Sequence, residues 1–286
     1  MPAEEIKGMP IANKIRDEII AQVQTLKAKG VQPKLAVVLV GDDEASKVYA
    51  QSKEKVGDKL GVKVELTVKP ASTSEDEVLA LVDQLNADQS VQGILVELPL
   101  PKHISKEKVM ARLDPVKDVD GVHPVNRGYL LGGQEHLALV PATPLACIEL
   151  MERAGVQLRG KRVALVGRGD TVGRPLASLL IKRDATITVC HTKTVDLPSI
   201  TRTAEIVVVA AGAAGLVKGD MLSPGQVVID AGINAKEGGG ICGDVEYETA
   251  SQVVKAITPV PGGVGSLTTS IIMNNLLKAI HLQGLA

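Results

Sequence analysis

The sequence has no Phe and no Trp, and only three Tyr occur among its 286 residues. A hydrophobic core must therefore be built from Val, Ile, Leu and Ala, since hydrophobic residues still make up 45% of the chain. This composition favours buried strands and closely packed helices over pockets lined by aromatic rings. An excess of charge of one sign is also missing, because 32 basic residues stand against 33 acidic ones. The overall charge therefore indicates neither a basic stripe for nucleic acid nor a polyacidic tail.

Cysteine is scarce: Cys147, Cys190 and Cys242 are an odd number, lie far apart and form no C-x-x-C pair. Neither a disulfide framework nor a zinc site is expected, so we predict no metal ion. Residues 1–8 lack the basic start and the apolar stretch of a secretory signal. The most apolar segment, residues 206–217, is interrupted by glycines and is shorter than the roughly 20 residues of a membrane span. We expect a soluble, cytoplasmic protein with no nucleic-acid or membrane partner.

Helical and strand-like patterns alternate in the first part of the chain. Three segments have helical period and three have the apolar or alternating pattern of strands: residues 11–29, 46–60 and 75–86 for helices, and residues 35–40, 62–68 and 93–98 for strands. This alternation predicts an α/β fold in which helices cover a parallel sheet. Frequent Pro and Gly between residues 99 and 144, with little helical period, indicate a domain junction.

The second part of the chain has four short apolar runs that predict buried strands: residues 163–166, 186–190, 206–210 and 227–230. A helix is predicted from Arg174 to Arg183, between the first two of these strands. The pattern is typical of a doubly wound, Rossmann-like nucleotide-binding domain.

A glycine-rich loop follows the first of these strands. Gly167, Gly169 and Gly173 give the spacing G-x-G-x-x-x-G, one residue longer than the usual dinucleotide fingerprint. Glycine lets the backbone turn sharply and approach a pyrophosphate, whose charge the N-terminus of the next helix stabilises. A tight turn without a ligand is the alternative interpretation of the loop alone.

The end of the second strand indicates which cofactor is bound. An Asp or Glu there would hold the ribose of NAD, but the chain has His191, Thr192 and Lys193, and Arg168 stands in the first loop. Cations and a hydroxyl suit a 2'-phosphate, so we predict NADP, with NAD as the alternative. The other interpretation is that His191 and Lys193 are solvated loop residues. Small residues around Gly212 and before Ile233 either admit a nicotinamide ring or serve tight turns.

A second cluster of reactive residues is predicted in the first domain. Ser46, Tyr49 and Lys53 project from one face of a helix, where Tyr and Lys either transfer protons or are ordinary exposed side chains. Glu97 ends a strand, and a charged turn contains Asp118 and Asp120. A carboxylate at a strand end can hold a polar heterocycle by paired hydrogen bonds. One of the two Asp residues is expected only to form the turn.

Several different short motifs are distributed over nearly the whole chain. In the first part they are residues 40–43 (VGDD), 45–49 (ASKVY), 53–55 (KEK), 91–94 (VQGI), 98–101 (LPLP) and 117–121 (KDVDG). In the second part they are residues 143–144 (TP), 160–161 (GK), 167–168 (GR), 172–175 (VGRP), 190–191 (CH), 243–245 (GDV) and 258–265 (TPVPGGVG). Together these motifs resemble the bifunctional methylenetetrahydrofolate dehydrogenase/cyclohydrolase family.

The resemblance implies an enzyme that oxidises 5,10-methylenetetrahydrofolate to the methenyl form with NADP and hydrolyses the product to 10-formyltetrahydrofolate. It implies two α/β domains, a folate-binding domain of residues 1–120 and 267–286 and a Rossmann-like NADP-binding domain of residues 121–266, with the C-terminal helix returning to the first domain. A homodimer through the nucleotide-binding domains is also implied.

The resemblance assigns roles to individual residues. Lys53 is the acid/base residue of hydrolysis, Tyr49 lies against the folate ring and Asp120 anchors the pterin. Expected catalytic residues are Lys53, Tyr49, Glu97 and Asp120, and expected substrate-binding residues are Ser46, Tyr49, Leu98, Pro99, Asp120, Pro261, Gly262 and Gly263. Expected cofactor-binding residues are Gly167, Arg168, Gly169, Val172, Gly173, His191, Thr192, Gly212 and Ile233.

The chain departs from the family pattern at several of these positions. Glu97 stands where the family usually has Gln, and its carboxylate would pair with Lys53, favour the charged amine and oppose its action as a base. We therefore expect hydrolysis to be reduced or altered. Gly169 removes a hydroxyl that the family usually has, whereas Thr192 keeps one. Two other functions stay open: a folate-binding paralogue with little turnover, and a dehydrogenase for another one-carbon pterin carrier.

Overall fold

The computed structural model describes residues 2–41, 44–236 and 238–286, with the side chains of residues 44–46, 48 and 49 outside the description. The chain forms two compact units. The three-stranded unit contains residues 14–142 and 269–286, and the six-stranded unit contains residues 1–13 and 143–268.

The three-stranded unit is built on a parallel sheet with the strand order β3-β2-β4. The strands are β2 (Lys34–Val40), β3 (Lys63–Lys69) and β4 (Gly93–Val96). The helices are α1 (Gly8–Ala28), α2 (Glu44–Leu60), α3 (Glu75–Ala87), α4 (Lys106–Arg112), α5 (Pro124–Leu131) and α10 (Thr268–Leu282), of which α1 and α10 begin in the other unit. Because β2 is paired on both sides and covered on both faces, its sequence is a continuous apolar run.

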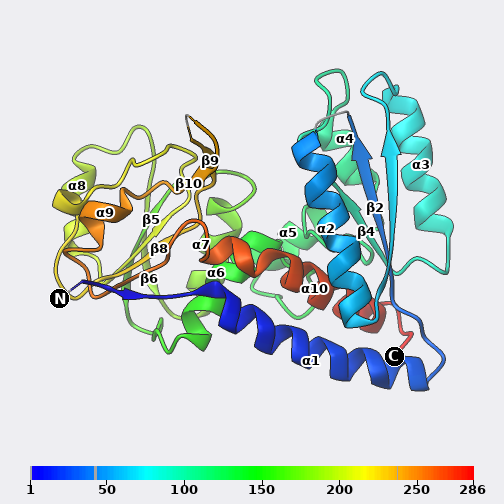
Figure 1. The fold of residues 1–286 in the computed structure, drawn as a ribbon, viewed down its shortest axis with the longest axis horizontal. Helices are drawn as coiled ribbons and strands as arrows, with labels where there is room; N and C mark the ends of the chain where they lie inside the picture. Colours follow the sequence, from blue (N-terminus) through cyan, green and yellow to red (C-terminus); the bar gives the residue numbers. More distant parts are fainter. Residues whose placement is uncertain (1, 42–43, 237) are drawn as a thin grey trace. The chain divides into compact units, whose positions relative to one another are not determined.

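Helices cover both faces of this sheet (Figure 1). Alternate residues of β2, Ala36, Val38 and Val40, pack with α3 and α4 in one core. Val64 of β3 faces the other way, where a Cβ on Gly57 of α2 would approach its Cγ2 to 2.4 Å. The sheet therefore lies between α2 and α3, and the ends of its strands hold the loops in place.

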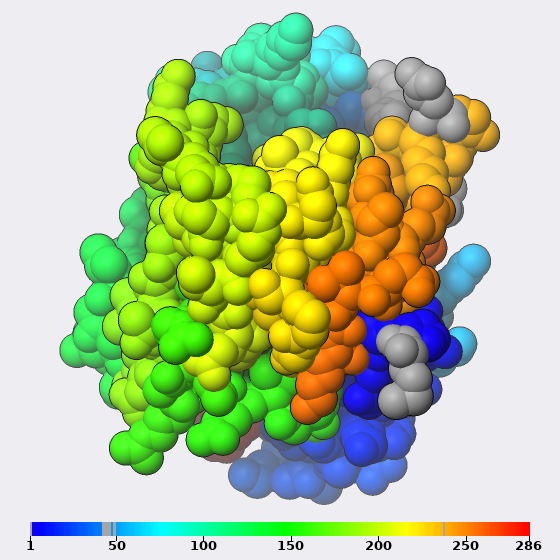
Figure 2. Space-filling model, turned by 90° about the vertical axis from the view of Figure 1, so that its left-hand side faces the viewer, coloured from blue at the N-terminus to red at the C-terminus, as the bar shows by residue number. Residues whose placement is uncertain are grey.

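The six-stranded unit contains a parallel sheet with the strand order β1-β11-β8-β7-β5-β6. The strands are β1 (Glu4–Glu5), β5 (Arg162–Val166), β6 (Thr186–Cys190), β7 (Ile206–Val209), β8 (Val227–Asp230) and β11 (Ala256–Ile257). The chain reverses direction across the sheet between β5 and β7, which is where doubly wound sheets bind ligands. The N-terminal segment, blue in Figure 2, lies beside the orange residues around β11, as the pairing of β1 with β11 requires.

Short helices and a hairpin complete this unit. The helical segments are α6 (Ala142–Arg153), α7 (Gly173–Lys182), α8 (Leu197–Thr203), α9 (Tyr247–Ala250) and the 3-10 turns η1 (Gly219–Met221) and η2 (Val264–Ser266). The hairpin joins β9 (Asn234–Ala235) to β10 (Ile241–Cys242). Among the described residues, no helix is both long enough and apolar enough to cross a membrane.

The predicted α/β class with two domains is confirmed, and α10 packs in the three-stranded unit as the resemblance implies. The Pro-rich stretch, in contrast, contains α4, α5 and the start of α6, which the sequence did not indicate. Helices of seven or eight residues are too short to show a clear period. Side chains fix where they begin: Ser105 accepts from Lys108 N at 3.3 Å, and His123 Nδ1 accepts from Val125 N at 3.1 Å.

The two units differ at their ends from the expected domains of residues 1–120 with 267–286 and 121–266. Residues 121–142 pack with the three-stranded unit, because Asn275 of α10 donates to the carbonyls of both Val119 and Val140 at 2.8 Å. Residues 1–13 belong to the six-stranded unit, because β1 extends its sheet.

Candidate active site

A buried ion pair lies at the carboxyl end of the three-stranded sheet. Lys53, on α2, is fully buried, and its Nζ lies 2.7 Å from Oε1 of Glu97, which directly follows β4. Glu97 is 9% exposed. A buried ammonium is costly unless a carboxylate compensates for the lost water, so the pairing expected from the sequence is confirmed. A buried lysine paired with a carboxylate at a strand end is suited to acid/base chemistry.

The turn at residues 117–121 adds two more carboxylates with different surroundings. Asp118 is buried and accepts from His123 N at 2.8 Å and from Asn126 Nδ2 at 2.9 Å, so it holds the turn together. Burial raises the pKa of Asp118 to about 6 despite these bonds. Of the two Asp residues, Asp118 thus has the structural role that was expected for one of them.

Asp120 lies in the electric field of the ion pair. Removal from water, together with the charges of Asp118 and Glu97, raises the pKa of Asp120 to about 7, and Lys53 opposes this rise. Asp120, Glu97 and Lys53, which come from three separate segments, are therefore brought together. Such a group changes its protonation near neutral pH and can either accept or donate a hydrogen bond to a polar heterocycle.

The remaining predicted folate residues are distributed over both units. Ser46 and Tyr49 are in α2, but their side chains lie outside the described part of the structure. Leu98 is half-buried against the core of the three-stranded unit, and Pro99 is exposed beside it. The residues Pro261, Gly262 and Gly263 belong to the six-stranded unit, just before η2.

The glycine loop of the six-stranded unit connects β5 to α7. Gly167 has a φ of +118°, and a Cβ there would lie 2.0 Å from the carbonyl oxygen of Ala210. A Cβ on Gly173 would lie 2.4 Å from the oxygen of Gly167, whereas a Cβ on Gly169 would meet no atom within 4 Å. Two of the three glycines are thus required by close backbone approach, and Gly169 is not.

The residues around this loop fit a dinucleotide with a 2'-phosphate. Val172 precedes α7, and no side chain of the described residues caps the start of this helix, where the helix dipole favours a phosphate. Arg168 and Thr192 are exposed, and His191 Nδ1 accepts from Lys193 N at 3.1 Å after β6. The segment directly after β6, residues 191–193, lacks the carboxylate that would repel the 2'-phosphate.

The loops after β7 and β8 reach the same edge of the sheet. Gly212 has a φ of +65°, and Ile233 is 63% exposed at the start of the hairpin. Sequence reasoning missed the residues that hold these loops, Asp230 and Asp244, both of which are buried. The signals available were an Asp that ends a buried strand and an Asp inside the motif at residues 243–245.

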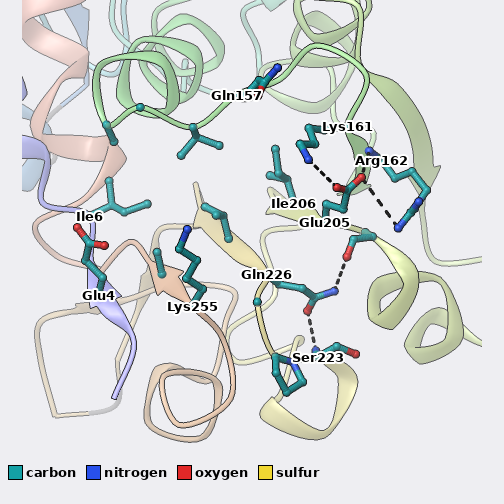
Figure 3. A pocket seen from close by; sticks show the side chains of 18 of the residues that line it. Glu4, Ile6, Gln157, Lys161, Arg162, Glu205, Ile206, Ser223, Gln226 and Lys255 are labelled. Carbon is teal, nitrogen blue, oxygen red and sulfur yellow. Dashed lines mark hydrogen bonds and ion pairs between the residues drawn. The ribbon is translucent and has the colours of Figure 1, made fainter. Parts of the chain in front are cut away.

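A groove of about 1080 Å³ lies at the opposite edge of this sheet, at the amino ends of β5, β7, β8 and β11 (Figure 3). Polar groups of its lining bond to one another: the Glu205 side chain pairs with Lys161 at 2.8 Å, and the Gln226 side chain accepts from the backbone N–H of Ser223 at 2.7 Å. Ligands of doubly wound sheets bind outside the carboxyl ends of the strands, so this groove is separate from the candidate site.

Comparison with known proteins identifies both units. The family model for the catalytic domain of tetrahydrofolate dehydrogenase/cyclohydrolase matches residues 6–120, and the model for its NAD(P)-binding domain matches residues 141–284. The chain is 58% identical, over 281 residues and 98% of each chain, to a protein of Desulfitobacterium hafniense named bifunctional protein FolD 2.

Solved structures of similar proteins match the fold of this chain over nearly its full length. The bifunctional FolD enzyme of Campylobacter jejuni has a TM-score of 0.95 at 42% identity and covers 98% of this chain and 99% of its own. The Trypanosoma brucei enzyme, solved with NADP cofactor and an inhibitor, has a TM-score of 0.93 at 36% identity and full coverage of both chains. Since both units match over nearly their whole length, the chain belongs to the tetrahydrofolate dehydrogenase/cyclohydrolase family.

Proposed function

We propose that this protein oxidises 5,10-methylenetetrahydrofolate to 5,10-methenyltetrahydrofolate with NADP and hydrolyses the product to 10-formyltetrahydrofolate. The observation that carries the proposal is the buried Lys53 amine, paired with Glu97 at 2.7 Å in the unit that matches the family's catalytic domain. The glycine loop of the other unit supplies the nucleotide site that the first reaction needs.

Oxidation requires alignment rather than side-chain chemistry. NADP, when bound, supplies the acceptor for the hydride that leaves the methylene carbon. The backbone at Gly167 and Gly173 lets the pyrophosphate approach the start of α7, and Val172 and Gly169 complete the loop. Arg168, His191 and Thr192 are proposed to bind the 2'-phosphate. Gly212 and Ile233 are proposed to border the nicotinamide.

Hydrolysis requires a base near the methenyl carbon. Lys53 in its neutral form removes a proton from the water that attacks this carbon, and its ammonium form returns a proton as the ring C–N bond breaks. Asp120 is proposed to anchor the pterin by hydrogen bonds, with Ser46, Tyr49, Leu98 and Pro99 beside it and residues 261–263 near the folate and nicotinamide. The Glu97 carboxylate stabilises the ammonium form of Lys53, so we propose that it slows this second reaction.

The two other functions considered from the sequence are less well supported. A folate-binding paralogue with little turnover would not need Lys53 buried beside a carboxylate, a costly arrangement typical of reactive sites. A dehydrogenase for another pterin carrier is disfavoured because relatives named bifunctional FolD match along 98% of this chain.

The experiment that tests the proposal follows NADPH and the methenyl product together after the purified protein is mixed with methylenetetrahydrofolate and NADP. We expect NADPH to form, and 10-formyltetrahydrofolate to appear faster than methenyltetrahydrofolate hydrolyses without the enzyme. A control with NAD tests the cofactor preference. Failure to form NADPH at micromolar enzyme would overturn the proposed oxidation.

A homodimer through the six-stranded unit is also proposed. Strand β6 is at the edge of its sheet, and among the described strands it pairs only with β5. Val189 of this strand is 38% exposed, and the nearby Ile181 and Val195 are 60% and 87% exposed. Edge strands with apolar side chains are normally covered, and a second copy of the unit would cover this one. A cytoplasmic location is supported by three free cysteines.

A further inference from the structure

Asp244 bonds to two loops at the carboxyl edge of the six-stranded sheet. Its Oδ2 accepts from Ala211 N at 2.6 Å and from Gly212 N at 2.8 Å. Its Oδ1 accepts from Ala213 N and from Asn234 Nδ2, both at 2.8 Å. One fully buried carboxylate thus holds three successive N–H groups after β7 and a side chain after β8.

Asp230, at the end of β8, holds Asp244 in turn. Its Oδ1 accepts from Gly232 N at 2.9 Å and from Asp244 N at 3.0 Å, and its Oδ2 accepts from Val245 N at 2.9 Å. The two carboxylates therefore act one through the other. Asp230 fixes the backbone of the segment that carries Asp244, and Asp244 fixes the loops after β7 and β8.

Glycines beside the two carboxylates make this arrangement possible. A Cβ on Gly243 would lie 1.8 Å from Oδ2 of Asp230, and a Cβ on Gly232 would lie 2.2 Å from Cγ of Asp244. Any other residue at either position would push a carboxylate away from its N–H donors. The local sequence is thus fitted to these two side chains at two positions, Gly232 and Gly243.

The loop that Asp244 holds lies against the glycine loop. The carbonyl oxygen of Ala210 would be 2.0 Å from a Cβ on Gly167. The backbones of the two loops therefore lie directly against each other where the strand order reverses. A shift of residues 211–213 would therefore alter the position at which a dinucleotide crosses the sheet edge.

We propose that Asp244 is a positioning residue for cofactor binding: through the N–H groups of Ala211, Gly212 and Ala213 it sets the loop that borders the bound dinucleotide. The proposal rests on the proposed function, because it assigns NADP to this edge of the sheet. Asp244 does not itself need to touch the cofactor, since all four of its bonds are to protein groups.

The variant Asp244→Asn tests this idea with little change of shape. In either orientation of the amide, its NH2 group faces two N–H donors, so two of the four bonds are lost. We expect the Kd and the KM for NADP to rise about tenfold or more, with kcat at saturating NADP within about threefold of the wild type. Hydrolysis of methenyltetrahydrofolate, which needs no NADP, should change by less than about twofold.

Two further variants keep the result interpretable. Asn234→Ala removes one bond of the network and should raise the Kd for NADP by about two- to fivefold, which decides the matter if Asp244→Asn does not fold. Glu248→Gln removes a negative charge from an exposed position on α9 and should leave the Kd unchanged.

Calorimetric titration with NADP and steady-state rates together separate the possible failures. An unchanged Kd in both Asp244→Asn and Asn234→Ala would overturn the inference, as would a fall in melting temperature and kcat with no change in KM. If the wild type binds NADP but forms no NADPH, the proposed oxidation fails, while the Kd values still test Asp244. If the wild type binds no NADP, both fail.

Discussion

The Lys53–Glu97 pair brings two buried groups of opposite charge together. With Nζ and Oε1 separated by 2.7 Å and both side chains almost fully buried, the ionised pair is held by mutual attraction that water does not screen. Binding of a flat, polar ring beside the pair would further exclude water and strengthen this attraction.

Replacing Glu97 by Gln should raise the rate of methenyltetrahydrofolate hydrolysis, by about tenfold if the carboxylate stabilises the ammonium by about 1.4 kcal/mol more than an amide does. The amide oxygen still accepts a hydrogen bond from Lys53, so the packing is kept. The measurement is the initial rate of hydrolysis without NADP.

The control for this variant is Glu54→Gln, which removes a carboxylate from the neighbouring position on α2. It should leave the rate within about twofold. If Glu97→Gln hydrolyses no faster than the wild type, the proposal that Glu97 slows the reaction is wrong.

Asp120 links the site to pH. Because its pKa is raised to about 7 in the folded protein, Asp120 binds its proton more tightly there than in the unfolded chain, where the pKa is about 4. Its contribution to stability is therefore lost as the pH rises from about 4 to about 7. The variant Asp120→Asn has an amide that does not titrate at this position. Its melting temperature should be higher than that of the wild type, and the difference should be larger at pH 8 than at pH 5.5.

Thermal denaturation of both proteins at the two pH values checks this expectation. Glu107→Gln, at an exposed position of α4, serves as the control and should show no gain that depends on pH. An Asp120→Asn protein that is less stable than the wild type at pH 8 would show that the carboxylate is favourably ionised there, contrary to the expectation.

At the scale of elements, the connection from β5 to α7 shows how unequal the three loop glycines are. Gly173 begins α7 with its Cα facing the backbone of Gly167 and Arg168, whereas Gly169 faces open space. The sequence motif alone does not distinguish the three glycines, because their spacing does not show which Cα atoms lie close to another part of the backbone.

Gly173→Ala should therefore raise the KM for NADP by about tenfold or more, since a methyl group at 2.4 Å from the Gly167 oxygen must move the loop. Gly169→Ala should change it by less than about twofold. Steady-state kinetics of NADPH formation measure both, and methenyltetrahydrofolate hydrolysis shows that each variant is folded. Equal effects of the two substitutions would contradict the structural distinction.

At the scale of the whole molecule, the apolar edge of the six-stranded sheet predicts self-association. Light scattering of the purified protein should give twice the mass of one chain at micromolar concentration. Val189→Lys places a charge on the exposed edge strand and should shift the mass towards one chain, because a lysine there disfavours pairing of edges. Lys102→Gln, at an exposed position of the other unit, is the control. A wild type with the mass of a single chain would refute the dimer.

The longer elements were predictable because they show a clear period or an unbroken apolar run. The helix expected at residues 75–86 is α3 (Glu75–Ala87), and the strand expected at residues 35–40 is β2 (Lys34–Val40). The two-residue strands β1 and β11 were not predictable, since pairing across more than 200 residues leaves no local pattern.

The sequence by itself determined the α/β class, the glycine loop and the residue types of the site, because period, turn residues and the absence of a carboxylate after β6 are local properties. Only the tertiary structure decided that Lys53 is buried against Glu97, that Asp118 holds a turn while Asp120 titrates near neutrality, and that Asp230 and Asp244 hold the cofactor-side loops. These properties depend on burial and on contacts between distant segments, which arise when strands pair and helices pack.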